Sequence, residues 1–156
     1  MVINRERIKL LLEHLKKLPD DEFDYTNWFK LEIQNGDNIP EYVGPQILQG
    51  SRANNVIRKA AKTNGPPACK TAGCIAGHCC LLFWEECKDR FEYEGFETTA
   101  TRLLGFDYHV GTPLFQNYMM VANKHDAIMR LEHLMEFDDL EDYDWTLERH
   151  HAEGDT

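Results

Sequence analysis

The sequence predicts an all-α fold: one compact multi-helix domain around a central helix rich in Cys, Gly and Ala, with at most one small β-hairpin. Apolar residues recur at helical spacing in several segments, and residues that cap helices stand at their ends. The chain has 156 residues, 42% of them hydrophobic, which suits one domain with a single core. We therefore assign residues 1–149 to one helical domain and residues 150–156 to a flexible tail.

The N-terminal part of the chain is expected to contain two helices separated by a loop. Asn4 is suited to cap a first helix that reaches about Leu18. Five apolar residues recur along this helix at the spacing of one face: Ile8, Leu11, Leu12, Leu15 and Leu18. Residues 34–52 contain so many Gly, Pro and Asn residues that we predict a loop insertion there. The second helix is predicted over residues 53–62.

The C-terminal part of the chain predicts four further helices, one of which would begin at Thr112-Pro113, a pair typical of an N-cap followed by Pro at the first helical position. The central helix is expected over residues 72–88, because its first half is apolar on nearly every side. A shorter helix is expected to end at Gly105, and Asn123 is suited to cap a last helix that reaches about Phe137. The side chains expected in the core include Ile8, Leu12, Leu15, Ile75, Leu82, Leu104, Ile128 and Leu131.

The charge of the chain is strongly acidic, with a formal net charge of -10. Because phosphates are bound by Lys and Arg, and no basic stripe is evident, we expect no specific binding to duplex nucleic acid. One acidic run contains no basic residue: Glu136, Asp138, Asp139, Glu141, Asp142 and Asp144. This run is either a solvated face, a docking surface for a basic partner protein, or a mimic of nucleic acid.

Hydropathy and cysteine usage bear on the compartment. The mean hydropathy is -0.54, and charged residues occupy the positions where the apolar part of a signal peptide would begin. We therefore expect a cytoplasmic protein that does not enter a membrane. The five cysteines are an odd number, which favours free thiols in a reducing compartment over a disulfide framework.

Two glycines stand out in the segment of residues 69–80, where the unusual chemistry of the sequence is concentrated. Gly73 and Gly77 lie one helical turn apart, although each Gly within a helix costs about 1 kcal/mol relative to Ala. A bulky group pressed against that face would explain both glycines, and Trp28 is our candidate. This explanation requires no ligand.

The same segment contains the candidate residues for metal binding and for catalysis. Cys74 and His78 are four residues apart and would share a helix face, and Cys69 precedes them, so the three are candidate ligands for zinc. Alternatively, Cys74 is a candidate nucleophile with His78 as its base. Packing is the simpler interpretation of both residues, because no oxyanion turn, phosphate loop or carboxylate pair completes a site. We therefore predict that the protein has no catalytic residues. If it does have any, Cys74 and His78 are the candidates.

The segment from Cys69 to Gly77 resembles an uncharacterised family of short bacterial and phage proteins that carry a Cys-Gly-Thr-x-x-Cys-x-Ala-Gly helix segment. Lys70 stands where that pattern usually has Gly, so the turn before the helix is expected to differ. The resemblance covers roughly residues 4–29 and 66–135. It implies a shared architecture and brings no activity with it.

These observations predict a non-enzymatic binding or interaction protein of unknown target. The resemblance to phage proteins suggests a product of a phage or mobile element that acts on a host protein. The alternative is a zinc-binding or thiol-dependent protein centred on Cys69, Cys74 and His78.

Overall fold

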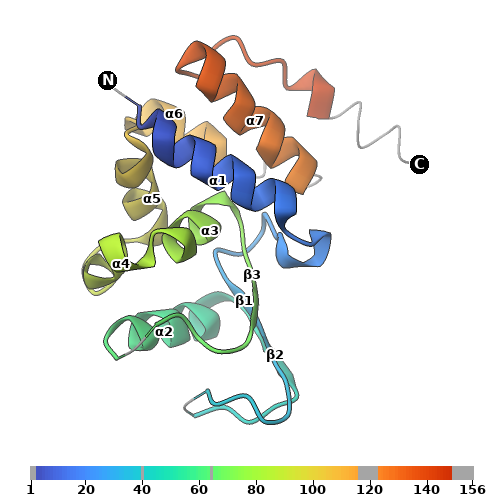
Figure 1. Cartoon of the computed structure of the whole chain (residues 1–156), viewed down its shortest axis with the longest axis vertical. Helices are drawn as coiled ribbons and strands as arrows, with labels where there is room; N and C mark the ends of the chain where they lie inside the picture. Colours follow the sequence, from blue (N-terminus) through green and yellow to red (C-terminus); the bar gives the residue numbers. More distant parts are fainter. Residues whose placement is uncertain (1–2, 40, 64, 116–122, 149–156) are drawn as a thin grey trace.

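Most helices of the protein pack together at one end of the molecule, and a small sheet with one further helix lies at the other end (Figure 1). The computed structural model describes residues 3–39, 41–63, 65–115 and 123–148. In chain order, the elements are α1 (Arg5–Lys17), a 3-10 turn η1 (Asp20–Glu22), β1 (Lys30–Ile33), β2 (Gln46–Leu48), α2 (Gly50–Ala61), β3 (Lys70–Ala72), α3 (Ile75–Leu82), α4 (Trp84–Cys87), η2 (Lys88–Arg90), α5 (Phe96–Leu104), α6 (Tyr108–Phe115) and α7 (Lys124–Phe137).

The three strands form an antiparallel sheet in the order β2-β1-β3, so the all-α prediction is wrong and the fold is mixed α/β. Leu31 of β1 pairs with Leu48 of β2 on one side and with Thr71 of β3 on the other. Each strand has only three or four residues. Runs this short give no clear alternating pattern in the sequence, and tertiary pairing decides their conformation.

The segment of residues 34–52, predicted to be a loop insertion, is partly regular structure. It contains β2, and α2 begins within it, at Gly50. The Gly, Pro and Asn residues that suggested a loop are concentrated before β2. One of them, Gly36, has a positive φ of 90°. The second predicted helix therefore exists and starts three residues earlier than predicted.

The predicted central helix over residues 72–88 is not continuous. Its first residue, Ala72, belongs to β3, and α3 begins only after Cys74. Phe83, with φ -105° and ψ 35°, separates α3 from α4, and Lys88 already belongs to η2. The burial predicted for this segment is confirmed in α3, which packs against α5 and buries its residues from Ile75 to Cys80. Leu82, predicted to lie in the core, is instead 37% exposed, because α3 ends there and Phe83 takes the buried position.

Side-chain caps fix the ends of two helices where the sequence predicts them. The Asn4 side chain accepts a hydrogen bond from the Arg7 amide (3.0 Å) at the start of α1. Asn123 and Asp126 form a reciprocal capping box at the start of α7. Gly105 ends α5 in the left-handed conformation, with φ 77°. Six of the remaining seven predicted core residues are buried and Ile128 is half-buried.

A buried ion pair holds the C-terminal segment, residues 138–148, onto the helices. Arg130 of α7 and Glu148 are fully buried, and the Arg130 Nε donates to a Glu148 carboxylate oxygen at 2.7 Å. The Arg130 guanidinium lies over the rings of Tyr25 and Trp145, at 4.7 and 4.9 Å from their centroids. Tyr143 donates to the same carboxylate at 2.7 Å. The predicted tail of residues 150–156 lies outside the described residues.

No helix within the described ranges is both long enough and apolar enough to cross a membrane.

Candidate functional site

The residues with predicted chemistry, Cys74 and His78, lie in the interior. Both are only 2% exposed. Burial raises the pKa of the Cys74 thiol to about 11, and burial lowers the pKa of His78 to about 4. At neutral pH the thiol therefore keeps its proton and the imidazole is neutral, which is the reverse of an activated thiolate–imidazolium pair.

Both ring nitrogens of His78 have partners other than a thiol. Its Nε2 lies 2.6 Å from the carbonyl oxygen of Glu22, and its Nδ1 lies 3.2 Å from Nε2 of His14. Because a carbonyl can only accept, Nε2 of His78 carries the proton, and its Nδ1 accepts from His14. Cys69, which is half-buried, precedes β3. Among the described residues, no three His, Cys, Asp or Glu side chains are grouped to hold a metal ion, so Cys69, Cys74 and His78 are not brought together as a ligand set.

The close packing predicted for Gly73 and Gly77 is confirmed. A Cβ on Gly77 would lie 1.9 Å from the carbonyl oxygen of Trp28, and a Cβ on Gly73 would lie 2.4 Å from it. The group that presses on the glycines is thus the backbone of Trp28, whereas its ring packs edge-on against Phe96. Close packing therefore accounts for both glycines of the segment.

The acidic run near the C-terminus is partly used for local structure. Asp138 ends α7 with φ 69° and forms an ion pair with Arg5. The side chains of Asp139 and Asp144 each accept a hydrogen bond from a backbone amide two residues on, at 3.1 Å. The other three acids are exposed: Glu136, Glu141 and Asp142. Docking of a basic partner on this run stays a prediction.

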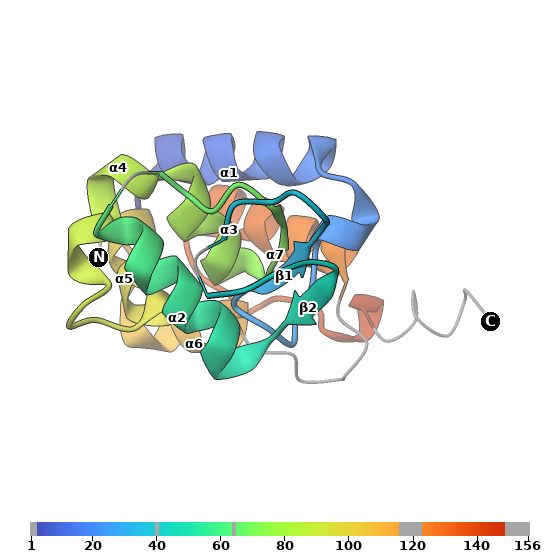
Figure 2. The same cartoon turned by 90° about the horizontal axis from the view of Figure 1, so that it is seen from below.

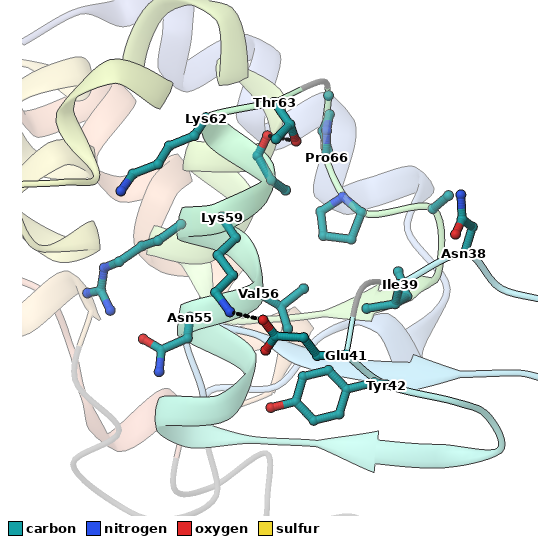
Figure 3. A pocket seen from close by; sticks show the side chains of 15 residues that line it. Asn38, Ile39, Glu41, Tyr42, Asn55, Val56, Lys59, Lys62, Thr63 and Pro66 are labelled. Atoms are coloured by element: carbon teal, nitrogen blue, oxygen red, sulfur yellow. Dashed lines mark hydrogen bonds and ion pairs between the residues drawn. The ribbon is translucent and has the colours of Figure 1, made fainter.

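A cavity of about 850 Å³ lies beside α2 (Figure 3). The helix α2 lies at the sheet end of the molecule, which faces the viewer in Figure 2. The walls of the cavity are α2, residues 65–68, and four loop residues on the opposite side: Asn38, Ile39, Glu41 and Tyr42 (Figure 3). Its volume is within the range of small-ligand sites, about 300–1,000 Å³. The described residues that line it are mostly apolar or uncharged, and include Ile39, Tyr42, Val56, Ala60, Pro66, Pro67 and Ala68.

An ion pair between Lys59 and Glu41 joins α2 to the loop on the opposite wall (Figure 3). The two side chains are 59% and 61% exposed. Glu41 has φ 74°, a left-handed conformation that a turn usually assigns to Gly or Asn. This turn is closed by the Tyr42 amide, which donates to the carbonyl oxygen of Ile39 at 3.2 Å. The turn thus places a carboxylate at the mouth of the cavity at some conformational cost.

The exposed face of α2 carries a basic stripe, which we define as Arg52, Asn55, Lys59 and Lys62. Their spacing of three, four and three residues places them on one helical face, and all four are exposed. From Tyr42 to Trp84 the chain has five Lys and Arg residues, and all 27 acidic residues lie outside this segment. The expectation that the chain has no basic stripe is therefore wrong for α2. That expectation rested on the net charge of the whole chain. The absence of Asp and Glu from Tyr42 to Trp84 is the feature of the sequence that indicates the stripe.

Comparison of the chain with protein-family models, curated proteins and solved structures gives no match. The resemblance to the family of short bacterial and phage proteins therefore stays a prediction.

Proposed function

We propose that this protein is a non-enzymatic binding module and that the α2 cavity is its binding site. The observation that carries the proposal is the cavity itself, about 850 Å³ in volume and lined largely by apolar side chains, with a few charged groups at its mouth. Ligand sites typically combine an apolar wall, which supplies affinity, with a few polar groups, which orient the ligand.

The chemistry of the cavity favours binding over catalysis. Its described lining contains no Cys, His or Ser, and its one carboxylate, that of Glu41, is paired with Lys59. The Thr63 hydroxyl donates to the carbonyl oxygen of Ala60 at 3.3 Å. The thiols of α3 are buried in the core and are not part of the lining.

The support of α2 fits a preformed site. Ala53, Val56 and Ile57 bury the inner face of α2, and the helix contacts β1 and η2. Val56 both belongs to this core face and lines the cavity. A wall held in this way loses little conformational freedom when a ligand binds, which favours affinity.

The test uses small uncharged aromatic probes, indole and phenol, titrated into isotopically labelled protein and followed by amide chemical shifts. We expect the shifts to concentrate on α2 and on the residues that line the cavity. Ala60→Trp, which fills the cavity, should abolish them. Ser51→Trp is the matched control, because Ser51 is exposed on the same helix and does not line the cavity. Shifts that lie elsewhere, or that persist in folded Ala60→Trp protein, would refute the proposal.

A further inference from the structure

We infer that the ligand of the α2 cavity is a short acidic segment of a partner protein with one apolar or aromatic anchor residue. The anchor would enter the cavity, and the flanking carboxylates would lie along the basic stripe. This inference rests on the proposed function and adds the chemical class of the partner to it.

Charge complementarity gives the first argument. The stripe of Arg52, Asn55, Lys59 and Lys62 extends over about 15 Å of α2, at 1.5 Å per residue. Within the described part of the chain, the one ion pair of Lys62 is with Glu92, at 3.5 Å between exposed side chains. Among the described residues, no carboxylate lies within ion-pair distance of Arg52. Arg52 and Lys62 are therefore weakly neutralised. Because the protein as a whole has a net charge of -10, an acidic partner is repelled least at this face of α2.

The cavity gives the second argument, because it favours a peptide over a nucleic acid as the ligand. The basic stripe lies directly beside the apolar cavity. Lys59 on α2 and Glu41 on the loop extend toward each other from opposite walls of this cavity (Figure 3). A polynucleotide would present phosphates far beyond the length of the stripe, where they would meet the acidic remainder of the protein. A short segment with one buried side chain uses both the stripe and the cavity and avoids that repulsion.

The Lys59–Glu41 ion pair gives the third argument, because a carboxylate of the partner could take the position that the Glu41 carboxylate holds beside Lys59. Both side chains are mostly in solvent, where such a pair contributes little to stability and exchanges readily. A carboxylate of the partner would bind Lys59 in place of Glu41. Glu41 therefore acts as an internal competitor, and removing its charge should strengthen binding.

The test is fluorescence anisotropy with a labelled peptide of about ten residues, Asp and Glu around one central Phe, at low salt. Arg52→Gln and Lys59→Gln should each weaken binding by about two- to fivefold, the range for exposed charge pairs. Glu41→Gln should strengthen it by a similar factor. Lys9→Gln is the matched control, because Lys9 is exposed on α1, outside the stripe, and should leave the affinity unchanged. Replacing the Phe of the peptide by Ser should weaken binding in every variant.

The outcomes separate this inference from the proposed function. If indole and phenol bind the cavity but the peptide does not bind at about 1 mM, the inference fails and the binding site stands. If neither binds, both fail. Tighter binding of a thymidine oligonucleotide than of the peptide, loss of peptide binding in Lys9→Gln, or weaker binding by Glu41→Gln would each overturn the inference. Self-association through the stripe that outcompetes the peptide would overturn it too, in favour of a second copy as occupant.

Discussion

Among the glycines of the described residues, Gly77 is the one at which an added Cβ would meet its nearest atom at the shortest distance, so Gly77→Ala tests the packing most directly. A Cβ at this position would lie 1.9 Å from the carbonyl oxygen of Trp28 and 3.0 Å from its carbonyl carbon. The first distance is 1.1 Å shorter than 3.0 Å, below which real Cβ contacts essentially do not occur. The obstacle is backbone rather than the end of a flexible side chain, so either α3 or the segment that precedes β1 has to move.

The expected loss of stability follows from two opposing terms. Overpacking a core with one additional methyl group costs about 1–3 kcal/mol, and a backbone obstacle puts this site at the upper end. Ala gains about 1 kcal/mol over Gly in a helix, which offsets part of that loss. We therefore expect Gly77→Ala to lower the free energy of unfolding by about 2 kcal/mol, and to lower the melting temperature by about 4–8 °C for a chain of this size.

Urea unfolding followed by tryptophan fluorescence would measure this change, with the slope of the transition as a check on two-state behaviour. Gly65→Ala is the matched control, because no atom lies within 4 Å of its added Cβ and its φ is not positive. We expect the control to change the free energy of unfolding by less than about 0.5 kcal/mol. If Gly77→Ala were as stable as the control, the packing explanation of the two glycines would be refuted.

Four further predictions address the buried pair, pH, thiols and metal. Glu148→Gln should lower the free energy of unfolding by about 3–5 kcal/mol, because the buried Arg130 charge loses its carboxylate; a loss under about 1 kcal/mol in urea unfolding would contradict this. Because burial lowers the pKa of His78 from 6.5 to about 4, the unfolded state takes up the proton first. Stability should therefore fall by about 3 kcal/mol between pH 6.5 and pH 4, and His78→Gln should flatten this slope. Under native conditions a thiol reagent should label Cys69 first, since the other four cysteines are buried, and Cys69→Ala should remove the fast phase. Elemental analysis of untagged protein should find much less than one equivalent of zinc, and a full equivalent would restore the set of Cys69, Cys74 and His78.

The helices could be predicted where local chemistry determines them. Asn4 and Asn123 cap their helices through hydrogen bonds to backbone amides three residues on, and both partners lie in the same short segment. The sheet could not be predicted, because Leu31 depends on partners as distant in sequence as Leu48 and Thr71. A strand of three or four residues has too little local preference to reveal such pairing.

The candidate site was hidden from the sequence for a related reason. The described residues of the cavity come from α2, from the loop around Ile39 and Tyr42, and from residues 65–68, and none of these segments carries a motif. The spacing of Cys74 and His78 suggested chemistry, but their burial depends on α5 and on the carbonyl of Glu22, which the spacing does not reveal. The basic stripe was readable in principle, because it depends only on helical spacing and on the missing acids.

The Arg130–Glu148 pair has a consequence for how the chain is made. Glu148 is synthesised 18 residues after Arg130 of α7, the residue whose charge it neutralises. The helix α1, which packs on α7, is synthesised before both. The carboxylate of Glu148 therefore becomes available to Arg130 only after α1 and the whole of α7 have been synthesised. Until residue 148 is made, the guanidinium of Arg130 cannot be buried against this carboxylate as it is in the folded protein.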